Sequence, residues 1–535
     1  MTKPARYINR SVLHAGAGAV NTKMLVAILV YASFICVVPA TAATCQSLPS
    51  VSLPNAKVTL AQIVASGGFT PPAQANGGVG HANLFEDLPE FCRVAIAAKP
   101  SDDSDIRIEV WLPISGWNGN FRAAGNGNWG GAINFDGMAA ILRTGFATAS
   151  TDTGHEAAPT SVEFALGHPE KLKDFGYRAF HEMTADAKAI IAAFYGGAPM
   201  ASYVAECGGG SREALSEIQR YPADYDAAGV YGFDGYKTLM HFGQLWVYRA
   251  THLDEASFLP PEALQLIHQA MLDKCDAATD GVKDGLVEDP PRCKFDPQVL
   301  LCGSAVGPNC LTAAQVKAAK MIYAPVTNPR TNEQVFSSLY PGSELAWDGL
   351  GGQRPFPNAV EFLRWVVFAD PQWQYKDRPP DFDRDLALAR QPEKAVINAD
   401  DSNLKQFVGR GGKLLMIEGW ADATIAPGGA VRYYDEVLTH SGNVKAARNS
   451  VRLFMVPGMG HCPGTNGREN FDTDTFGILK QWRETGKAPD HLIATRYQNG
   501  KEAGKRLVCA YPQVAVYKGS GAVEDPQNFT CRLPK

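Results

Sequence analysis

Short apolar runs that alternate with helical patterns constrain the fold of this chain more than any other feature. The runs lie at residues 144–150, 202–207, 226–231, 413–418 and 451–456, whereas residues 106–112 alternate apolar and charged residues, as a half-exposed strand does. Two of the runs, at residues 413–418 and 451–456, are flanked by Gly and Pro, as buried parallel strands are. Helical periodicity marks residues 177–195, 212–220, 430–439 and 473–482. This alternation predicts an α/β fold, a parallel sheet with helices on both faces.

The middle of the chain, residues 232–403, differs from what flanks it. It is rich in Pro, Gly, Asp and Trp, holds four cysteines, and shows helical patterns at 261–272 and 312–323. We interpret it as a lid domain inserted into the sheet. The sheet domain then comprises residues 43–231 and 404–535.

The N-terminus has the pattern of a secretion signal. Basic residues precede an apolar run at 24–38, and residues 40–42 read Ala-Thr-Ala, the small-x-small pattern of a cleavage site. We therefore expect a signal peptide at residues 1–42 and a secreted or periplasmic mature protein. The long basic lead leaves open whether Met1 or Met24 is the start. A membrane anchor is the alternative, although the run is short for a span. No integral membrane association is expected after signal removal.

The cysteine count agrees with secretion. The chain has 11 cysteines, and Cys36 lies in the signal, which leaves an even number in the mature protein. An even count behind a signal implies disulfides. Zinc is the alternative, but the sequence has no C-x-x-C pair.

Charge excludes one class of partner. The formal net charge is -5, with both signs mixed along the chain and no basic block. A nucleic-acid partner therefore has no electrostatic support.

Three loops follow expected strands in the order that a hydrolase triad requires. In α/β-hydrolases the nucleophile sits on a tight strand-to-helix turn, and the acid and the histidine follow it along the chain. The first loop lies within residues 203–212, the second carries Asp422 and the third carries His461. Loops at the carboxyl ends of parallel strands are where such folds place their active sites.

Cys207, then Asp422, then His461-Cys462 resembles the signature of the tannase and feruloyl esterase family. Further likeness lies at residues 125–129, 152–155, 175–178 and 219–222. The resemblance implies an α/β-hydrolase, a doubly wound sheet with a large inserted lid domain. It also implies a carboxylic ester hydrolase that acts on small aromatic esters, hydroxycinnamoyl or galloyl-like, with Asp422 as triad acid and His461 as general base.

The nucleophile position departs from that family. The family reads Gly-Cys-Ser-x-Gly-Gly-Arg at this turn, whereas residues 206–212 read Glu-Cys-Gly-Gly-Gly-Ser-Arg. Aligned without a gap, Gly208 replaces the catalytic serine, and glycine cannot form an acyl-enzyme. Ser211, about one helical turn further on, is the alternative nucleophile, or else a first-turn helix residue. A third route has His461 and Asp422 activate water directly in the gap at Gly208.

The resemblance also assigns the oxyanion hole, which needs two backbone N–H groups. One is Gly209, directly after the nucleophile position. The other belongs to the glycine-rich loop 125–131, where Gly127 is the first choice and Asn128 the second.

Residues 275–286 place three carboxylates close together in a short Asp- and Gly-rich stretch. Such a stretch can supply the oxygen ligands that Ca²⁺ prefers, although it is not an EF-hand. A solvated turn is the alternative. The family has a structural Ca²⁺ here, and one extra residue follows the first aspartate in this chain. The ligands carried over are Asp276, Asp280 and Asp284 through side chains, and Val282 and Leu286 through carbonyl oxygens.

The resemblance further implies how the ten remaining cysteines pair. Cys207 would bond to Cys462 directly beneath the site and so fix the nucleophile position relative to the base. The other pairs are Cys45–Cys92, Cys275–Cys293, Cys302–Cys310 and Cys509–Cys531.

Two functions remain open at this point. One is an extracytoplasmic esterase for aromatic esters. The other is a pseudo-esterase that binds such esters without turning them over. Gly208 favours the second, and the retained Asp422 and His461 favour the first.

Overall fold

The computed structural model describes residues 42–73, 82–305, 307–462, 469–498 and 501–534. Residues 42–535 form one compact unit. The expected signal peptide lies outside the described residues, apart from Ala42. Within the described ranges, no helix has the length and apolar character needed to span a bilayer.

A nine-stranded sheet forms the centre of this unit, in the order β1-β2-β3-β5-β4-β6-β7-β10-β11. From β5 to β11 all neighbours are parallel, as the sequence predicts, whereas β1, β2 and β3 pair antiparallel. Only residues 99–105 join β2 to β3, too few for the helical crossover that a parallel pair needs. The strands are β1 Ala56–Val64, β2 Phe91–Ala98, β3 Ile106–Pro113, β4 Phe121–Ala123, β5 Ala147–Thr151, β6 Ser202–Gly208, β7 Ala227–Phe233, β10 Lys413–Gly419 and β11 Val451–Val456.

Helices cover both faces of the sheet, because its central strands are apolar on both sides. In β10, Leu414 and Met416 belong to one core, while Leu415 and Ile417 belong to the other. The first core is covered by α3 (Ala179–Tyr195), α4 (Gly209–Arg220) and α13 (Gly428–Ser441). The second is covered by α1 (Phe135–Leu142) and α15 (Thr475–Thr485).

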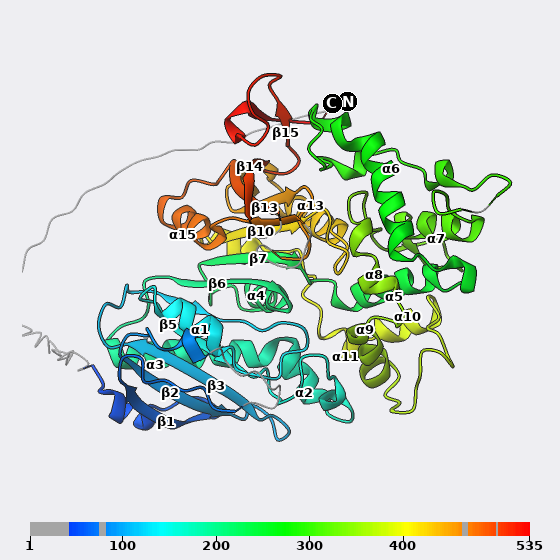
Figure 1. The fold of residues 1–535 in the computed structure, drawn as a ribbon. Coiled ribbons are helices and arrows are strands. Elements are labelled where there is room, and N and C mark those ends of the chain that lie inside the picture. The colour runs from blue at the N-terminus through cyan, green and yellow to red at the C-terminus, as the bar shows by residue number, and fades with distance from the viewer. Residues whose placement is uncertain (1–41, 74–81, 306, 463–468, 499–500, 535) are drawn as a thin grey trace, which may run out of the picture. The chain divides into compact units, whose positions relative to one another are not determined.

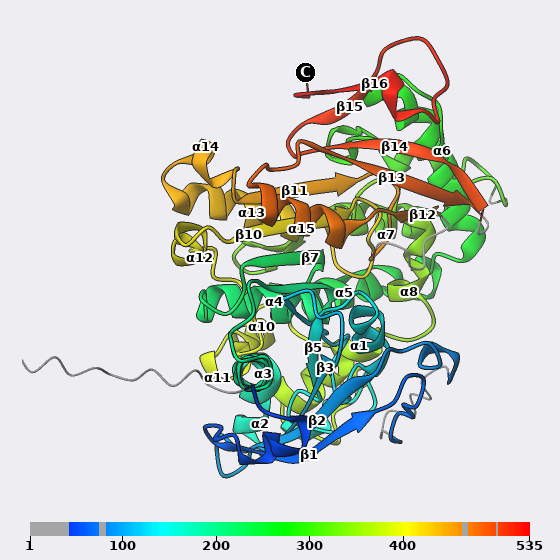
Figure 2. The same cartoon turned by 90° about the vertical axis from the view of Figure 1, so that its left-hand side faces the viewer.

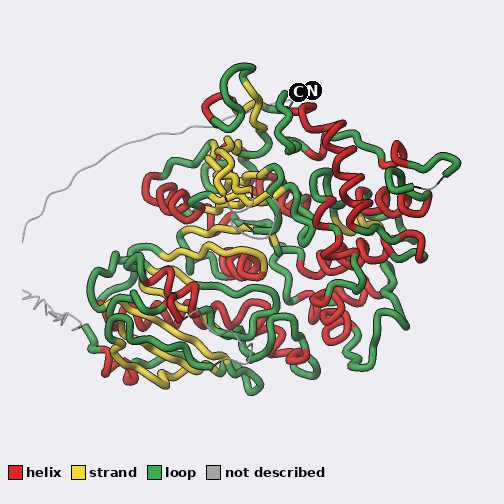
Figure 3. Tube along the Cα trace, viewed as in Figure 1, coloured by secondary structure: helices red, strands yellow, loops and turns green. Residues whose placement is uncertain are grey.

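The middle of the chain is almost entirely helix and loop, as Figure 3 shows. Its helices gather together beside the sheet in Figure 1. The helix expected at 261–272 continues eight residues further, to Asp280. The helices are α5 Lys237–Thr251, α6 Pro261–Asp280, α7 Ala313–Tyr323, α8 Asp348–Gly351, α9 Pro357–Glu361, α10 Arg384–Ala389 and α11 Pro392–Ala395, with β8 (Val326–Thr327) paired to β9 (Gln334–Phe336). Helix α12 (Lys405–Gly409) follows this region and precedes β10.

The C-terminal strands lie beyond the β11 edge of the sheet, at the end opposite β1–β3 (Figure 2). They form a three-stranded antiparallel sheet and a separate two-stranded one. The remaining elements are α2 Pro169–Lys173, α14 Val444–Ala447, β12 Glu469–Asp472, β13 His491–Gln498, β14 Lys501–Cys509, β15 Val514–Tyr517 and β16 Phe529–Arg532.

Five disulfides join the ten cysteines after Cys36, in the pairs that the resemblance implies. Their Cα–Cα distances, 4.9 to 6.1 Å, are normal for disulfides. The pairs are Cys45–Cys92, Cys207–Cys462, Cys275–Cys293, Cys302–Cys310 and Cys509–Cys531.

Candidate active site

A histidine–aspartate pair lies at the carboxyl ends of β10 and β11. Asp422 is fully buried, and its Oδ2 lies 2.8 Å from Nδ1 of His461. Its Oδ1 accepts the backbone N–H groups of Thr424 (2.7 Å) and Ile425 (2.9 Å). Held in this way, the carboxylate favours the tautomer with a proton on Nδ1, which leaves Nε2 to act as a base.

The charge of Asp422 also sets the basicity of the imidazole. Burial acts to lower the pKa of His461, but the neighbouring Asp422 carboxylate outweighs it and raises that pKa above the usual value. The side chain of His461 is 31% exposed, so the base is accessible from solvent.

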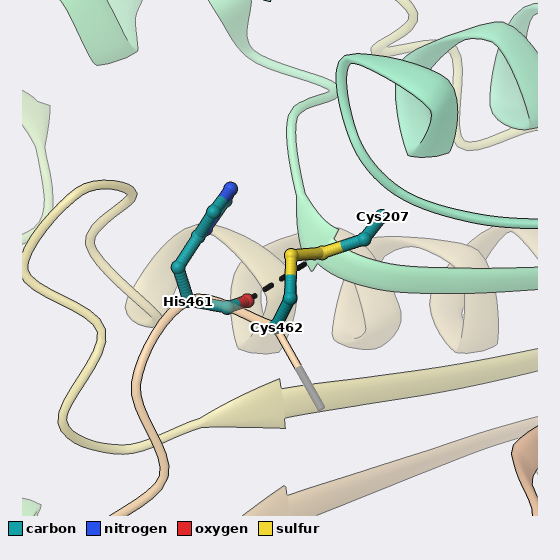
Figure 4. A group of neighbouring side chains, drawn as sticks. All are labelled: Cys207, His461 and Cys462. Carbon is teal, nitrogen blue, oxygen red and sulfur yellow. Dashed lines mark hydrogen bonds between the residues drawn. A yellow bond between two sulfur atoms is a disulfide. The ribbon is translucent and has the colours of Figure 1, made fainter. Parts of the chain in front are cut away.

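The Cys207–Cys462 disulfide joins the two halves of the site. Cys207 is at the end of β6 and Cys462 directly follows His461, with their Cα atoms 6.1 Å apart. Figure 4 shows the disulfide beside His461, bridging the strand to the loop that carries the base. The bond therefore fixes His461 relative to the β6–α4 turn.

Gly208 occupies that turn in the conformation of a nucleophile elbow. Its φ of 57° and ψ of -119° are left-handed backbone, which glycine tolerates and other residues adopt only with strain. A Cβ added to Gly208 would lie 2.9 Å from Nε2 of His461. Residue 208 is thus the position from which a side chain would reach the base, and it has none.

Ser211 is committed to the backbone of the same turn. Its Oγ lies 2.6 Å from the carbonyl oxygen of Gly208 and 3.0 Å from that of Gly232. It also accepts the N–H of Asp234 at 3.2 Å, and the residue is fully buried. In the described part of the chain, no hydroxyl is hydrogen-bonded to the imidazole of His461. The position of Ser211 therefore agrees with a first-turn structural role.

The two parts of the expected oxyanion hole lie against each other. A Cβ at Gly209 would sit 3.0 Å from the backbone nitrogen of Asn128 and 3.1 Å from the carbonyl carbon of Gly127. Across the described ranges, neither the N–H of Gly127 nor that of Asn128 has a hydrogen-bond acceptor. Both N–H groups are therefore available to a ligand, and Gly209 needs to be glycine for the loop to approach.

Two glutamates that the sequence reasoning did not assign hold this loop. Glu206 Oε1 accepts the N–H of Gly125 at 2.9 Å, and Glu213 Oε2 accepts the N–H of Asn126 at 2.9 Å. Burial raises the pKa of Glu213 to about 7. The signal for Glu206 was present in the sequence, because this chain has glutamate where the family has glycine before the cysteine.

Two glycines and a third carboxyl group were also missed. A Cβ at Gly232 would meet the carbonyl oxygen of His461 at 2.6 Å, and one at Gly419 would meet that of Met459 at 2.1 Å. Glu418 is buried behind the site and accepts the N–H of Phe233 at 2.7 Å. Burial, and then the charge of Asp422, raise the pKa of Glu418 well above its usual value. Spacing alone carries no signal for these contacts, because they join β7, β10 and the His461 loop.

The expected calcium segment begins inside helix α6, which ends at Asp280 and is capped by Gly281 (φ 87°). Asp276 and Asp280 are therefore one helical turn apart, on the same face. Asp280 Oδ1 accepts the N–H of Val282 and Asp284 Oδ1 that of Leu286, both at 3.1 Å. These turns orient two carboxylates next to the helix end.

Arg506 of β14 forms ion pairs with carboxylates in and next to this segment. Its guanidinium donates to Asp280 Oδ2 (3.1 Å), Asp284 Oδ2 (2.5 Å) and Glu288 Oε2 (2.7 Å). Three carboxylates thus surround one guanidinium, and a fourth, Asp276, accepts the backbone N–H groups of Asp284 and Gly285. Asp276, Asp280 and Glu288 are buried. The surplus of negative charge and the oxygen donors fit a hard divalent cation such as Ca²⁺.

Comparisons with known proteins agree on one family. The family model described as tannase and feruloyl esterase matches residues 92–532. An uncharacterized esterase of Xanthomonas campestris pv. campestris is 34% identical over 91% of each chain. The probable feruloyl esterase B-2 of Aspergillus fumigatus is 29% identical, over 90% of this chain and 94% of its own.

Solved structures give the same result. Feruloyl esterase B from Aspergillus oryzae superimposes with a TM-score of 0.82 at 27% identity, over 91% of this chain and 99% of its own. Tannin acyl hydrolase from Aspergillus niger, at 21% identity, shares the fold with a TM-score of 0.74 over 91% and 94% of the two chains.

Proposed function

The chain belongs to the tannase and feruloyl esterase family, and from this premise we propose that it hydrolyses small aromatic carboxylic esters by direct attack of water. His461 and Asp422 would be the catalytic base and its acid partner. The observation that carries the proposal is the position of Gly208, whose absent side chain would point at Nε2 of His461 from 2.9 Å. A water molecule that takes the place of the missing hydroxyl would be activated by the same base.

The reaction then has one covalent step fewer than in a serine esterase. Nε2 of His461 takes a proton from water as its oxygen attacks the ester carbonyl carbon, and Asp422 stabilises the imidazolium. The carbonyl oxygen becomes an oxyanion that accepts N–H groups of Gly209 and of Gly127 or Asn128. When the carbon–oxygen bond to the alcohol breaks, the alcohol takes the proton from His461. One ester and one water give one acid and one alcohol.

Turnover assays on methyl ferulate, methyl gallate and a nitrophenyl ester test this proposal. Slow, steady hydrolysis without a burst is expected, since no acyl-enzyme accumulates. It should be lost in His461→Gln, while Ser211→Ala should keep it if the variant folds. A fluorophosphonate probe should leave the wild type unlabelled. Labelling that disappears in Ser211→Ala would contradict the proposal and identify Ser211 as the nucleophile.

A binding protein without turnover is the second candidate. It is favoured by the lack of a hydroxyl group hydrogen-bonded to His461 among the described residues. Saturable binding of methyl ferulate, with no hydrolysis above the buffer rate and none lost in His461→Gln, would establish this second function.

We also propose an extracytoplasmic location and a structural Ca²⁺. The five disulfides support the first, because such bonds persist in oxidising compartments. Three carboxylates paired with Arg506, and a fourth, Asp276, hydrogen-bonded to the backbone of the same loop, support the second. Asp276, Asp280 and Asp284, with the carbonyl oxygens of Val282 and Leu286, would hold the ion and tie α6 to the strand that carries Arg506.

A further inference from the structure

A second group of ionisable side chains lies between helices α3 and α4, away from the proposed active site. It consists of His181 on α3, Glu217 near the end of α4, and Asp224 in the turn that follows α4. One ligand atom from each lies within 4.8 Å of the other two. Glu217 is eight residues after Gly209 on one helix, about 12 Å along its axis.

The distances within this group suit a small cation. His181 Nδ1 is 2.9 Å from Asp224 Oδ2 and 3.9 Å from Glu217 Oε2. Ligand atoms of a tetrahedral ion with bonds near 2.0–2.1 Å lie roughly 3.3–3.5 Å apart, between these two values. Changes of roughly half an ångström in these two distances would bring both into that range.

Glu217 is the residue of this group whose surroundings indicate a bound ligand. It is fully buried, and within the described chain neither of its carboxylate oxygens has a hydrogen-bond partner. A buried carboxylate without a partner is costly, so such groups are normally paired or bound to metal. Nδ1 of His181 lies 3.9 Å from Glu217 Oε2, which is too far away for a hydrogen bond.

The other two members are already held in place. The ring of His181 stacks on Tyr221, with centroids 3.4 Å apart and planes 8° apart. Lys188 interacts with Asp224 through Oδ1, at 3.5 Å, which leaves Oδ2 directed at His181. The side chains of His181 and Asp224 are 26% and 18% exposed, so an ion can enter from solvent.

We infer that His181, Glu217 and Asp224 bind a divalent transition-metal ion of the zinc or cobalt type. An imidazole nitrogen and two carboxylates are ligands that such ions accept, whereas Ca²⁺ and Mg²⁺ prefer oxygen alone. Lys188 adds a positive charge nearby and limits the affinity. The ion displaces a proton from His181, so binding strengthens as the pH rises. The site does not depend on ester hydrolysis.

Titration of the full mature protein with Co²⁺ and Zn²⁺ tests the inference, with Ca²⁺ present to occupy oxygen-only sites. Isothermal calorimetry should show one strong Zn²⁺ site, and Co²⁺ should give a d–d absorption band that Zn²⁺ removes. Zn²⁺ should also raise Tm, because the folded protein alone forms the site. A wild type with no saturable site below about 100 µM, roughly 5.5 kcal/mol on the affinity scale, would overturn the inference.

Variants then decide which residues form the site. His181→Gln and Glu217→Gln should each weaken Zn²⁺ binding by at least about tenfold, since even indirect partners of metal ligands contribute that much. Glu217→Gln replaces a buried carboxylate that has no hydrogen bond within the described chain, so its metal-free Tm should fall little, and it stays informative if His181→Gln does not fold. Glu182→Gln, on the same helix next to His181, is the matched control and should bind as the wild type does. Unchanged binding in Glu217→Gln would show that the ion sits elsewhere and overturn the assignment.

Discussion

At the scale of single residues, position 208 decides how the His461–Asp422 pair can be used. The surrounding turn keeps the left-handed backbone of a nucleophile elbow, and the backbone N–H groups of Gly127 and Asn128 remain free of acceptors within the described chain. What is missing is one hydroxyl group. On the proposed function, the departure at residue 208 therefore replaces the nucleophile and leaves its surroundings in place.

Gly208→Ser should raise esterase activity by roughly 10²-fold or more, because it restores a covalent route to a waiting base. Two costs accompany the gain. The imidazole must give way, since the new Cβ would lie 2.9 Å from Nε2. The positive φ costs a further 1–3 kcal/mol or so of stability. Rates on methyl ferulate, together with melting curves, measure both effects.

Gly208→Ala is the matched control for that substitution. It adds the same Cβ and the same backbone strain but no hydroxyl group, so its stability should fall equally and its activity should not rise. A folded Gly208→Ser protein that is no more active than Gly208→Ala on any aryl ester would refute the claim that only the hydroxyl is missing.

Sequence reasoning placed some of these residues well, for a physical reason. Asp422 and His461 follow apolar strands directly, so chain order and strand ends are enough to bring them together. Glu418, Gly232 and Gly419 were missed because their roles are contacts between separate strands and loops. For Ser211 the sequence leaves both a nucleophilic and a first-turn role, because spacing does not show the hydrogen bonds that its hydroxyl makes to the backbone.

At the scale of elements, Glu213 of helix α4, which accepts a hydrogen bond from Asn126 of the oxyanion loop, should make the stability of the protein depend on pH. Burial raises the pKa of Glu213 to about 7 from 4.5, so the folded protein holds this proton where the unfolded chain has lost it. Its contribution to stability is present below pH 4.5 and is lost as the pH rises to 7. The loss is on the order of 3 kcal/mol at most, at about 1.4 kcal/mol per pKa unit.

Glu213→Gln removes this titration and keeps an acceptor for the N–H of Asn126. Between pH 4.5 and 7, the Tm of the wild type should therefore fall relative to that of Glu213→Gln. The exposed Glu163→Gln controls for the loss of one negative charge. If the two variants show the same pH trend relative to the wild type, the buried proton is not on Glu213.

Helix α6 and the strand that carries Arg506 should be linked by calcium. EDTA should lower the Tm of the mature protein, and added Ca²⁺ should restore it, because an ion bound only by the folded state stabilises that state. Asp284→Asn should weaken the response, while Asp273→Asn, which changes an exposed acid on α6, should not. An unchanged melting curve in EDTA, with no metal found by elemental analysis, would mean that Arg506 alone balances these carboxylates.

The element scale also shows where sequence patterns stop being informative. Continuous apolar runs located β6, β7, β10 and β11 to within one or two residues, since burial on both faces of a sheet leaves a strong signal in the sequence. The antiparallel edge β1–β3 was not foreseen, because strand direction depends on connection length. The extension of α6 was hidden because Asp and Gly suggested a loop, whereas the four-residue spacing of Asp276 and Asp280 suits a helix.

At the scale of the whole molecule, the disulfides connect segments that lie far apart along the chain. Cys207 and Cys462 are separated by 255 positions and Cys45 and Cys92 by 47, whereas Cys302 and Cys310 are separated by 8. Closing a longer loop restricts the unfolded chain more, so the Cys207–Cys462 bond should contribute the most on this account. It is also the bond that fixes the base at the β6–α4 turn.

The mature protein should therefore contain five disulfides and no free thiol. Titration with a thiol reagent in denaturant, without reductant, should detect less than one reactive group per chain, and two or more would contradict the pairing. Cys207→Ala with Cys462→Ala should lower Tm more than Cys302→Ala with Cys310→Ala, the matched control for losing one bond. The Cys207→Ala, Cys462→Ala variant should also lose ester hydrolysis at temperatures where it is still folded, because His461 is no longer held at the turn. If the wild type is inactive, the same two substitutions should abolish the activity that Gly208→Ser gains. If activity per folded molecule survives in that variant, the disulfide serves stability alone, and the loop around His461 is positioned by Asp422 without it.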